Sequence, residues 1–320
     1  MVNYERCDIF IANLPETKFE GRISFPSPIA QGLRHVVVLH NPNELVHDSR
    51  MVLIAPIILF SELETSGSPL LASHIPIETK DFPFLTEDAF ISTHQLMSIN
   101  RDWLNPTKCG KITSLDHVYR MDLSIIQVAG LIEHLQREII EIAKEKLQIH
   151  ISLPPKKAAS TSVSSVRTFV RGDVFYASLP TQNYSNGGFP PSYTVEGRHM
   201  VVCLHDSHDE SYDPEQVLVT PITSASTTVR HGSLMPSHVP LLSSDHNYLT
   251  KDCFVSVHQM MPVSRDWLDK NIRGNIGLQL FELDLAFVIA GDLQEIKARI
   301  FIEELNKITQ AALQEIEKIS

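Results

Sequence analysis

A chain of 320 residues is long enough for two ordinary domains of about 150 residues each, and its 43% apolar residues let both bury a core. Charged residues make up only 20%, which excludes wholesale disorder. The net charge of −11 excludes binding to polyanions through the overall field, so binding to nucleic acid would need a local cationic groove.

The cysteines and apolar runs indicate the surroundings of the protein. The four cysteines form no C-x-x-C pair, which argues against a zinc ribbon, and their sparse placement favours reduced thiols. The first residues lack the apolar core of a signal peptide, and the longest apolar run, residues 51–60, is too short to span a bilayer as a helix. We therefore expect a cytoplasmic protein with no membrane partner.

The first half of the chain begins with short runs of Val, Ile and aromatic residues, which predict strands. These runs cover residues 6–15, 34–40, 52–58 and 73–76. Pro56 interrupts the third run and predicts a strand end, an edge or a bulge there. A helical pattern follows, with apolar residues at spacings of three and four: Ile132, Leu135, Ile139 and Ile142.

Residues 153–169 are rich in Ser, Ala and Pro and predict a linker. The second half then repeats the strand pattern, with a further strand expected at 254–258 that places Phe254, Ser256 and His258 on one face. The last helical stretch, from Leu293 to Ile316, is long, and we expect its extra turns to pack on the tail of the first half.

Two acidic residues, Asp122 and Asp284, recur near the predicted helices of the two halves. We expect both at helix starts, where a negative charge complements the helix dipole.

The two halves repeat each other in the same order. STHQLMSINRDWL begins at Ser92 and SVHQMMPVSRDWL begins at Ser256, 164 positions later (256 − 92). Further matches join residues 6–15 with 171–180, 34–40 with 198–205, 52–58 with 217–223, 73–76 with 237–240 and 121–123 with 283–285. A repeat of this length excludes a small solenoid unit. It predicts two domains, 1–152 and 170–320, joined by the linker 153–169, each a small antiparallel sheet or barrel followed by a helix.

The second copy carries RGDVFYASLP, GRHMVVCLH, VLVTPITS, PSHVPL and FVSVHQMMPVSRDWL in this order, and resembles the PemK/MazF toxins of bacterial toxin–antitoxin systems. The resemblance covers residues 5–135 and 170–295. It implies two tandem SH3-like β-barrels, each followed by a C-terminal helix, arranged as a pseudo-dimer within one chain. It also implies cleavage of single-stranded RNA without a metal or other cofactor, and an antitoxin protein as a partner. Further homodimerisation stays open.

Metal-free RNA cleavage uses the ribose 2′-hydroxyl as nucleophile and leaves a 2′,3′-cyclic phosphate and a 5′-hydroxyl. The enzyme supplies a base, an acid for the leaving oxygen and donors for the charge on the phosphate. A guanidinium matches two phosphate oxygens, which suits Arg198, and Thr223 offers a hydroxyl donor. Because a histidine titrates near neutrality, His258 or His238 can act as base or acid.

The resemblance places the reacting arginine and threonine of the family on Arg198 and Thr223, and a further polar position on His258, before Gln259. Aromatic residues of the loop 181–197, among them Tyr184 and Tyr193, can stack on splayed bases.

In the first copy, the resemblance places the equivalent arginine on Arg34 and the histidine on His94, which we expect to contact RNA. The threonine position is Ile58, which cannot donate a hydrogen bond, so this copy is expected to hold a degenerate site. A histidine, His35 or His199, stands where the family has proline after the arginine. Since RHMVVCLH is one residue longer than RHVVVLH, the alignment after the arginine is open by one place.

Structural alternatives stand beside each of these roles. Arg198 is otherwise a surface residue at a strand start, Thr223 a cap, the paired histidines hydrogen-bonded groups under turns, and the aromatic residues plugs of a barrel mouth. No histidine pair has metal-ligand spacing, so no metal site is expected. Two rival functions follow: a non-catalytic module that binds RNA or protein, and a toxin of the CcdB kind that binds DNA gyrase.

Overall fold

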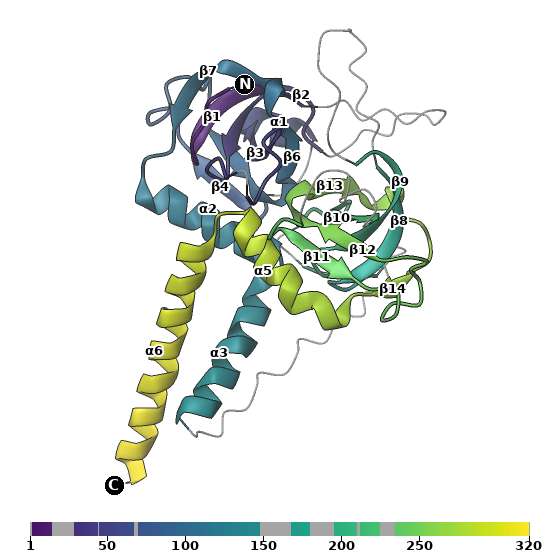
Figure 1. The fold of residues 1–320 in the computed structure, drawn as a ribbon. Coiled ribbons are helices and arrows are strands. Elements are labelled where there is room, and N and C mark those ends of the chain that lie inside the picture. Colours follow the sequence, from purple (N-terminus) through teal and green to yellow (C-terminus); the bar gives the residue numbers. More distant parts are fainter. Residues whose placement is uncertain are drawn as a thin grey trace.

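The computed structural model describes residues 2–14, 29–43, 45–66, 70–147, 168–179, 195–209, 212–224 and 234–319. Two antiparallel sheets of seven strands, each followed by helices, lie side by side as the two halves of the chain (Figure 1). The expected mainly β chain with helices, laid out in two halves, is thereby confirmed. Apart from Thr168 and Phe169, the predicted linker lies outside the described residues, as do Tyr184 and Tyr193.

The two sheets have the same strand order. The first has the order β4-β5-β3-β2-β1-β7, with β6 also pairing with β3, and the second has the order β11-β12-β10-β9-β8-β14, with β13 also pairing with β10. The first sheet comprises β1 (Asp8–Leu14), β2 (Gly32–Val38), β3 (Met51–Leu59), β4 (His74–Ile77), β5 (Ala89–Ser92), β6 (Met97–Asn100) and β7 (Leu104–Lys111). The second comprises β8 (Asp173–Leu179), β9 (Gly197–Cys203), β10 (Gln216–Ser224), β11 (His238–Leu241), β12 (Cys253–Ser256), β13 (Met261–Ser264) and β14 (Gly274–Asn275).

Short helical elements and longer helices complete each half. The first half adds α1 (Phe60–Ser66), η1 (Thr93–Gln95), η2 (Arg101–Trp103), α2 (Leu115–Val128) and α3 (Leu131–Leu147). The second half adds η3 (Val257–Gln259), η4 (Arg265–Trp267), η5 (Gly277–Gln279), α5 (Leu280–Ala290) and α6 (Gln294–Ile319). The strand expected at 254–258 therefore ends at Ser256, and His258 lies in a 3-10 turn instead.

Proline lies inside the long strands β3 and β10, so the expected strand end was wrong, whereas Pro221 has a paired strand on one side only, as at an edge. β10 pairs with β13 up to Val219 and with β12 from Ile222 onward, while Pro221 pairs with Val201 on the other side. The strand thus passes from one partner to the next at the proline. A residue without an N–H costs no ladder hydrogen bond where no strand lies beside it.

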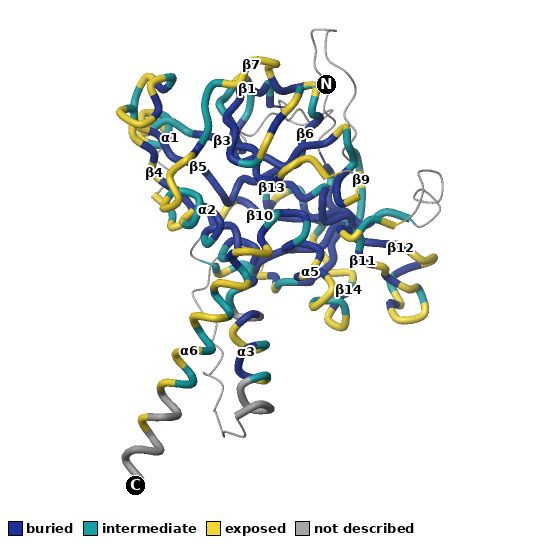
Figure 2. The backbone as a smooth tube through the Cα atoms, turned by 60° about the vertical axis from the view of Figure 1, so that its left-hand side comes forward, coloured by how far each residue is buried: buried dark blue, intermediate teal, exposed yellow. Residues whose placement is uncertain are grey.

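The two halves share their core. One buried cluster joins alternate residues of both sheets, including Phe10, Val36 and Ile99 of the first and Phe175 and Val263 of the second. The opposite faces of the strands pack with the helices in a second cluster that also draws on both halves. Figure 2 shows the resulting band of buried backbone across both sheets. At the junction, Ser98 N donates to Met260 O at 3.1 Å, which ties β6 to the second half.

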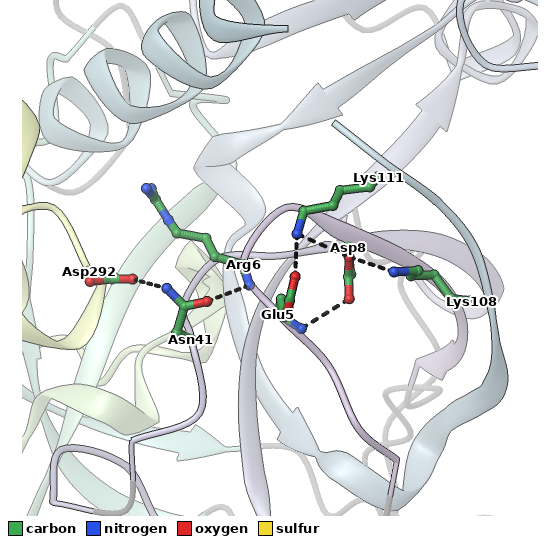
Figure 3. A network of polar contacts seen from close by, with 7 residues as sticks. All are labelled: Glu5, Arg6, Asp8, Asn41, Lys108, Lys111 and Asp292. Carbon is green, nitrogen blue, oxygen red and sulfur yellow. Dashed lines mark hydrogen bonds and ion pairs between the residues drawn. The ribbon is translucent and has the colours of Figure 1, made fainter. Parts of the chain in front are cut away.

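Figure 3 shows polar contacts that tie the start of the first sheet to its surroundings. Lys108 Nζ lies 3.2 Å from Asp8 Oδ1, which closes β1 against β7. The side chain of Asn41 accepts from Arg6 N at 3.0 Å and donates to Asp292 Oδ2 at 3.0 Å, so a loop of the first half is bonded to the second. The halves are therefore held by polar contacts as well as by the shared core.

Arginine–aspartate pairs fix the helices to the sheets. Arg6 pairs with Asp122 of α2, and Arg171 pairs with Asp284 of α5. Asp122 lies in the middle of α2 and Asp284 lies beyond the first turn of α5, so the expected positions at helix starts were wrong, and each carboxylate forms an ion pair. Burial raises the pKa of Asp122, and the Arg6 guanidinium opposes that rise.

The helices α3 and α6 project together from the sheets (Figures 1 and 2). The two helices contact one another, and Lys297 Nζ of α6 lies 3.4 Å from Glu138 Oε2 of α3. The expectation that the last helix packs on the tail of the first half is confirmed.

The start of each sheet needs a left-handed backbone residue. Cys7 has a φ of 68° and Gly172, at the same place in the repeat, has a φ of 87°. Both residues bond across the sheet, since Cys7 N donates to Val38 O and Gly172 N to Cys203 O. Glycine adopts this conformation without a steric penalty, whereas a residue with a Cβ does not.

We expect Gly172→Ala to lower the free energy of unfolding by about 1–3 kcal/mol, because the left-handed backbone becomes strained. The added Cβ would also lie 2.9 Å from Leu280 Cδ2, so that side chain must shift. Urea unfolding measures the loss. Gly277→Ala is the matched control, because its Cβ would meet no atom closer than 3.4 Å and its φ is not positive. An equal loss in both variants would contradict this account.

Candidate functional site

The end of β10 and the neighbouring strands β11 and β12 bring hydroxyl and imidazole groups to one face of the second half. Thr223 pairs with Phe254, and its hydroxyl lies 3.4 Å from Ser256 Oγ. His238 pairs with Ser256, and its ring centroid lies 4.5 Å from that of Phe254. These residues share a face because paired antiparallel residues point the same way. We call Thr223, His238, Phe254 and Ser256, with His199 added below, the threonine face.

His238 is a neutral hydrogen-bond donor on this face. Its Nδ1 accepts from Met235 N at 3.1 Å, so the proton of the neutral ring is on Nε2. Burial lowers the pKa of His238 to about 4, and the side chain is half-buried. The ring is therefore uncharged near neutrality and retains one edge toward solvent.

His258 lies beneath this face and is 2% exposed. Its Nδ1 lies 3.1 Å from Ser237 Oγ, and that hydroxyl donates to Val46 O of the other half at 2.6 Å. Because the serine has one proton to give, it accepts from Nδ1–H of the histidine. Burial lowers the pKa of His258 to about 3. The histidine that was expected to meet RNA thus contacts the chain itself and positions the serine beside His238.

Gln259 and Gln95 are also engaged with the backbone. Gln259 Oε1 accepts from Val195 N at 3.1 Å, and Gln95 Oε1 accepts from Ala30 N at 2.8 Å. Each glutamine thereby fixes the chain just before β9 or β2. His94 is 1% exposed, and its Nδ1 lies 2.9 Å from Ser73 Oγ, which repeats the His258 arrangement.

The first half places different groups at the same positions. Ile58 pairs with Phe90 where Thr223 pairs with Phe254. The helix α1 follows β3 directly, and its Phe60 ring lies edge-on to Phe90 at 4.9 Å. Glu62 of α1 pairs with Arg34, whose Nε also donates to Gln31 O at 2.8 Å. The first copy therefore offers an apolar surface and an arginine that is already neutralised by a carboxylate.

The sheet registers resolve the alignment that the sequence left open by one place. Gly32 pairs with Leu14 and Gly197 with Leu179, and both glycines have positive φ, at 72° and 78°. Counting from these glycines, Leu33 corresponds to Arg198, and Arg34 corresponds to His199. The expected match of Arg34 with Arg198 was wrong, because the offset between the halves is 165 residues both at Gly32 and Gly197 (197 − 32) and at Ile58 and Thr223 (223 − 58), so the Arg-His run of the second half begins one position earlier in its strand.

This shift decides which residues share a face. Val201 pairs with Pro221. Side chains alternate along a strand, so His199, two residues before Val201, and Thr223, two residues after Pro221, lie on the same face as that pair. Val202 pairs with Thr220. Alternation along each strand then places Arg198 on the face of Val202 and Thr223 on the opposite face. His199 thus shares a face with Thr223 and Arg198 points to the opposite face, so among the described strands the expected pairing of Arg198 with Thr223 is not formed.

Arg198 lies instead against Tyr176, with its Cζ 4.8 Å from the ring centroid. Its Nη2 lies 2.6 Å from Asp269 Oδ2, and the arginine side chain is 62% exposed. Sequence reasoning missed His199 and Glu62. The available signal for His199 was the glycine before each run, Gly32 and Gly197, from which the two runs can be aligned. Nothing in the repeat pattern indicated a helix after β3.

The described residues also limit other kinds of site. In the described ranges, no three His, Cys, Asp or Glu residues cluster closely enough to hold a metal ion. None of the helices in that part of the chain is long and apolar enough to cross a bilayer.

Comparison with known proteins gives likenesses to solved structures alone: no family model and no curated protein sequence matches the chain. The similar structures include the Mycobacterium tuberculosis toxin MazF-mt6, with 18% identity over 39% of this chain and 97% of the toxin, at a TM-score of 0.27. They also include a mycobacterial endoribonuclease in complex with its cognate antitoxin (15% identity, 38% and 92% covered, TM-score 0.26) and a mycobacterial endoribonuclease (13%, 41% and 98%, TM-score 0.29). At these TM-scores we draw neither fold nor activity from the likeness.

The buried histidines predict an acid-sensitive fold. Burial lowers the pKa to about 4 for His40, to about 3 for His205 and His258, and to about 2 for His47. The ordinary value is about 6.5, so below that pH the unfolded chain binds protons that the folded chain does not. The stabilisation is complete above pH 6.5 and is lost as pH falls toward the folded values.

Between about pH 7 and pH 5 most carboxylates stay ionised, and we expect roughly 2 kcal/mol of lost stability for each fully buried histidine. Urea midpoints measured across this window at constant ionic strength check the prediction. A midpoint that does not change from pH 7 to pH 5 would show that these imidazoles are not buried in the neutral form.

Proposed function

We propose that the chain is a MazF-like, metal-independent endoribonuclease that cuts single-stranded RNA at the threonine face of its second half. The proposal joins the sequence resemblance to one observation. At the same register positions the second half carries Thr223 and His199, whereas the first half carries Ile58 and an arginine paired with Glu62. The hydroxyl and imidazole groups suit RNA cleavage, and the first-half groups do not.

Each group on the threonine face has a role in this proposal. The 2′-hydroxyl of the RNA attacks the adjacent phosphate and His199 accepts its proton, while His238 donates from Nε2–H to a phosphate oxygen, since burial lowers the pKa of both rings and keeps them neutral at pH 7. The charge of a bound phosphate raises these pKa values toward the working range. Thr223 donates to a phosphate oxygen. His258 positions the turn at Ser237, and Arg198 contacts RNA on the face of β9 opposite to the threonine face. The products are a 2′,3′-cyclic phosphate and a 5′-hydroxyl.

The arrangement of the halves extends the proposal. We propose that the domains 1–152 and 170–320 are SH3-like barrels that form a pseudo-dimer, because the halves share both buried clusters and bond across their junction. An antitoxin protein and single-stranded RNA are the proposed partners, and the cytoplasm is the proposed location. No cofactor is invoked.

A non-catalytic binding module is the second candidate. The observation that favours it is that Arg198 and Thr223 lie on opposite faces of the second sheet, which removes the strongest phosphate-binding group from the threonine face. No feature of the described residues favours a gyrase-binding role.

A cleavage assay tests the proposal. We expect discrete 5′-hydroxyl products when the full chain is incubated with a long single-stranded RNA in EDTA. Binding of the RNA without cleavage would support the binding module instead.

Thr223→Ala should lower the cleavage rate by about 10²-fold, because one donor to the phosphate is lost. Ile58→Ala is the matched control at the equivalent position of β3 and should leave the rate unchanged, since isoleucine has no donor. Melting temperatures establish that both variants are folded. Equal rates in the two variants would place the reaction elsewhere on the molecule.

A further inference from the structure

Tyr176 on the second half lies against two arginines. The Cζ atoms of Arg198 and Arg273 lie 4.8 and 5.0 Å from its ring centroid. Asp269 lies between the arginines, with Oδ2 2.6 Å from Arg198 Nη2 and 3.8 Å from Arg273 Nη2. Lys270 follows and is exposed. We call Tyr176, Arg198, Asp269, Lys270 and Arg273 the tyrosine platform.

Backbone bonds fix the platform to the sheet edge. Asp269 N donates to Tyr176 O at 2.7 Å, and Arg273 N donates to Val174 O at 2.8 Å. The segment that supplies three of the platform residues therefore runs along β8, while Arg198 reaches the same ring from β9. The side chains are held near one another by the strands and do not depend on a mobile loop.

The platform is a local cationic surface on an acidic chain. Its three cations and one carboxylate leave two positive charges (3 − 1), whereas the whole chain carries −11. The Arg198 and Arg273 side chains are 62% and 41% exposed. Exposed guanidinium groups beside an aromatic ring match the alternating phosphates and bases of a single strand.

The first copy provides an internal comparison. The registers place Ile11 at the position of Tyr176 and Leu33 at that of Arg198. In β7, the bridges of Leu104 and Gly110 correspond to those of Leu268 and Gly274 in the second half. Counting from these bridges, Asn105, Pro106 and Cys109 stand where the second half has Asp269, Lys270 and Arg273. All five positions have lost their charge or aromatic ring, yet the first copy forms the same sheet. The fold therefore does not require the platform.

We propose that the tyrosine platform binds single-stranded RNA, with Arg198 and Arg273 on neighbouring phosphates and a base against Tyr176. This inference rests on the proposed RNA-cleaving function and adds the surface that positions the substrate. His199 and Arg198 are adjacent in β9 and point to opposite faces, so a strand that crosses the rim of the sheet reaches both the threonine face and the platform. A phosphate replaces Asp269 as the partner of the guanidinium groups.

The test replaces the platform with residues of the first copy. The swap variant carries Tyr176→Ile, Arg198→Leu, Asp269→Asn and Arg273→Ser. The first copy has Cys109 at the position of Arg273, and serine is used there in place of cysteine. The probe is a fluorescein-labelled 2′-O-methyl oligouridylate of about 12 nucleotides, long enough for a site of this kind and without the 2′-hydroxyl that cleavage needs. Fluorescence anisotropy with the full chain gives Kd across a salt titration from about 50 to 200 mM.

We expect the swap to weaken Kd about tenfold or more, and the slope of log K against log salt to shrink by about 1.4, or 0.7 for each lost phosphate contact. Arg120→Leu is the matched control, because Arg120 is 44% exposed and is paired with Asp116, yet lies on α2 away from the platform. It should leave both quantities unchanged.

Three results would overturn the inference: no binding of the probe to the wild-type chain, an unchanged Kd and slope in the swap variant, or an equal loss in Arg120→Leu. A further measurement replaces the RNA probe with a poly-glutamate peptide of similar length. If that peptide binds as tightly as the RNA and with the same dependence on the swap, the platform is a site for acidic protein segments. Failure of the proposed function is separate, since it appears as unchanged RNA cleavage in Thr223→Ala while the non-cleavable probe still reports on the platform.

Discussion

The packing of two equivalent sheets across shared buried clusters is the constraint on which the rest of this molecule depends. Each strand has side chains on two faces, and in both halves one face contributes to a cluster that joins the two sheets while the other packs with the helices. With both faces committed, polar groups can collect only where strands end or change partner. The threonine face occupies such a place, where β10 leaves β13 and joins β12.

The same packing explains why the paired histidines are buried. The turn that carries His258 is close to the junction of the halves, where Ser98 also donates to the His258 carbonyl. A charged imidazole there would lose its hydration, and the Asp48 carboxylate offsets only part of that loss, so the neutral form is strongly favoured. Tyr212 plays a matching part for the other half, with its hydroxyl donating to Val128 O at 2.6 Å and its ring stacked on His205. Because the two halves belong to one chain, the contacts at His258 and at Tyr212 form within a single molecule.

The two halves also differ in the groups that they carry on the same sheet. The first half retains the sheet and the buried histidine, but its equivalent of the threonine face is apolar and flanked by α1, and its equivalent of the platform is uncharged. The second half retains hydroxyl and imidazole groups on one side of β9 and arginines on the other. Since two halves that share a core stabilise each other whichever carries the site, the loss of polar groups from one half costs the fold little.

The sequence alone determined the repeat, the strand-rich halves, the helical tails and their association, because these depend on composition and periodicity over many residues. It did not determine which residues of β2 and β9 correspond. That question turned on a single position, and since side chains alternate along a strand, a shift by one residue moves a side chain to the opposite face of the sheet. Only the register of Gly32 and Gly197 against their neighbours placed His199 on the face of Thr223 and turned Arg198 toward Tyr176. The burial of His258 was likewise decided by the tertiary structure, because residues of the first half pack over the turn that carries it.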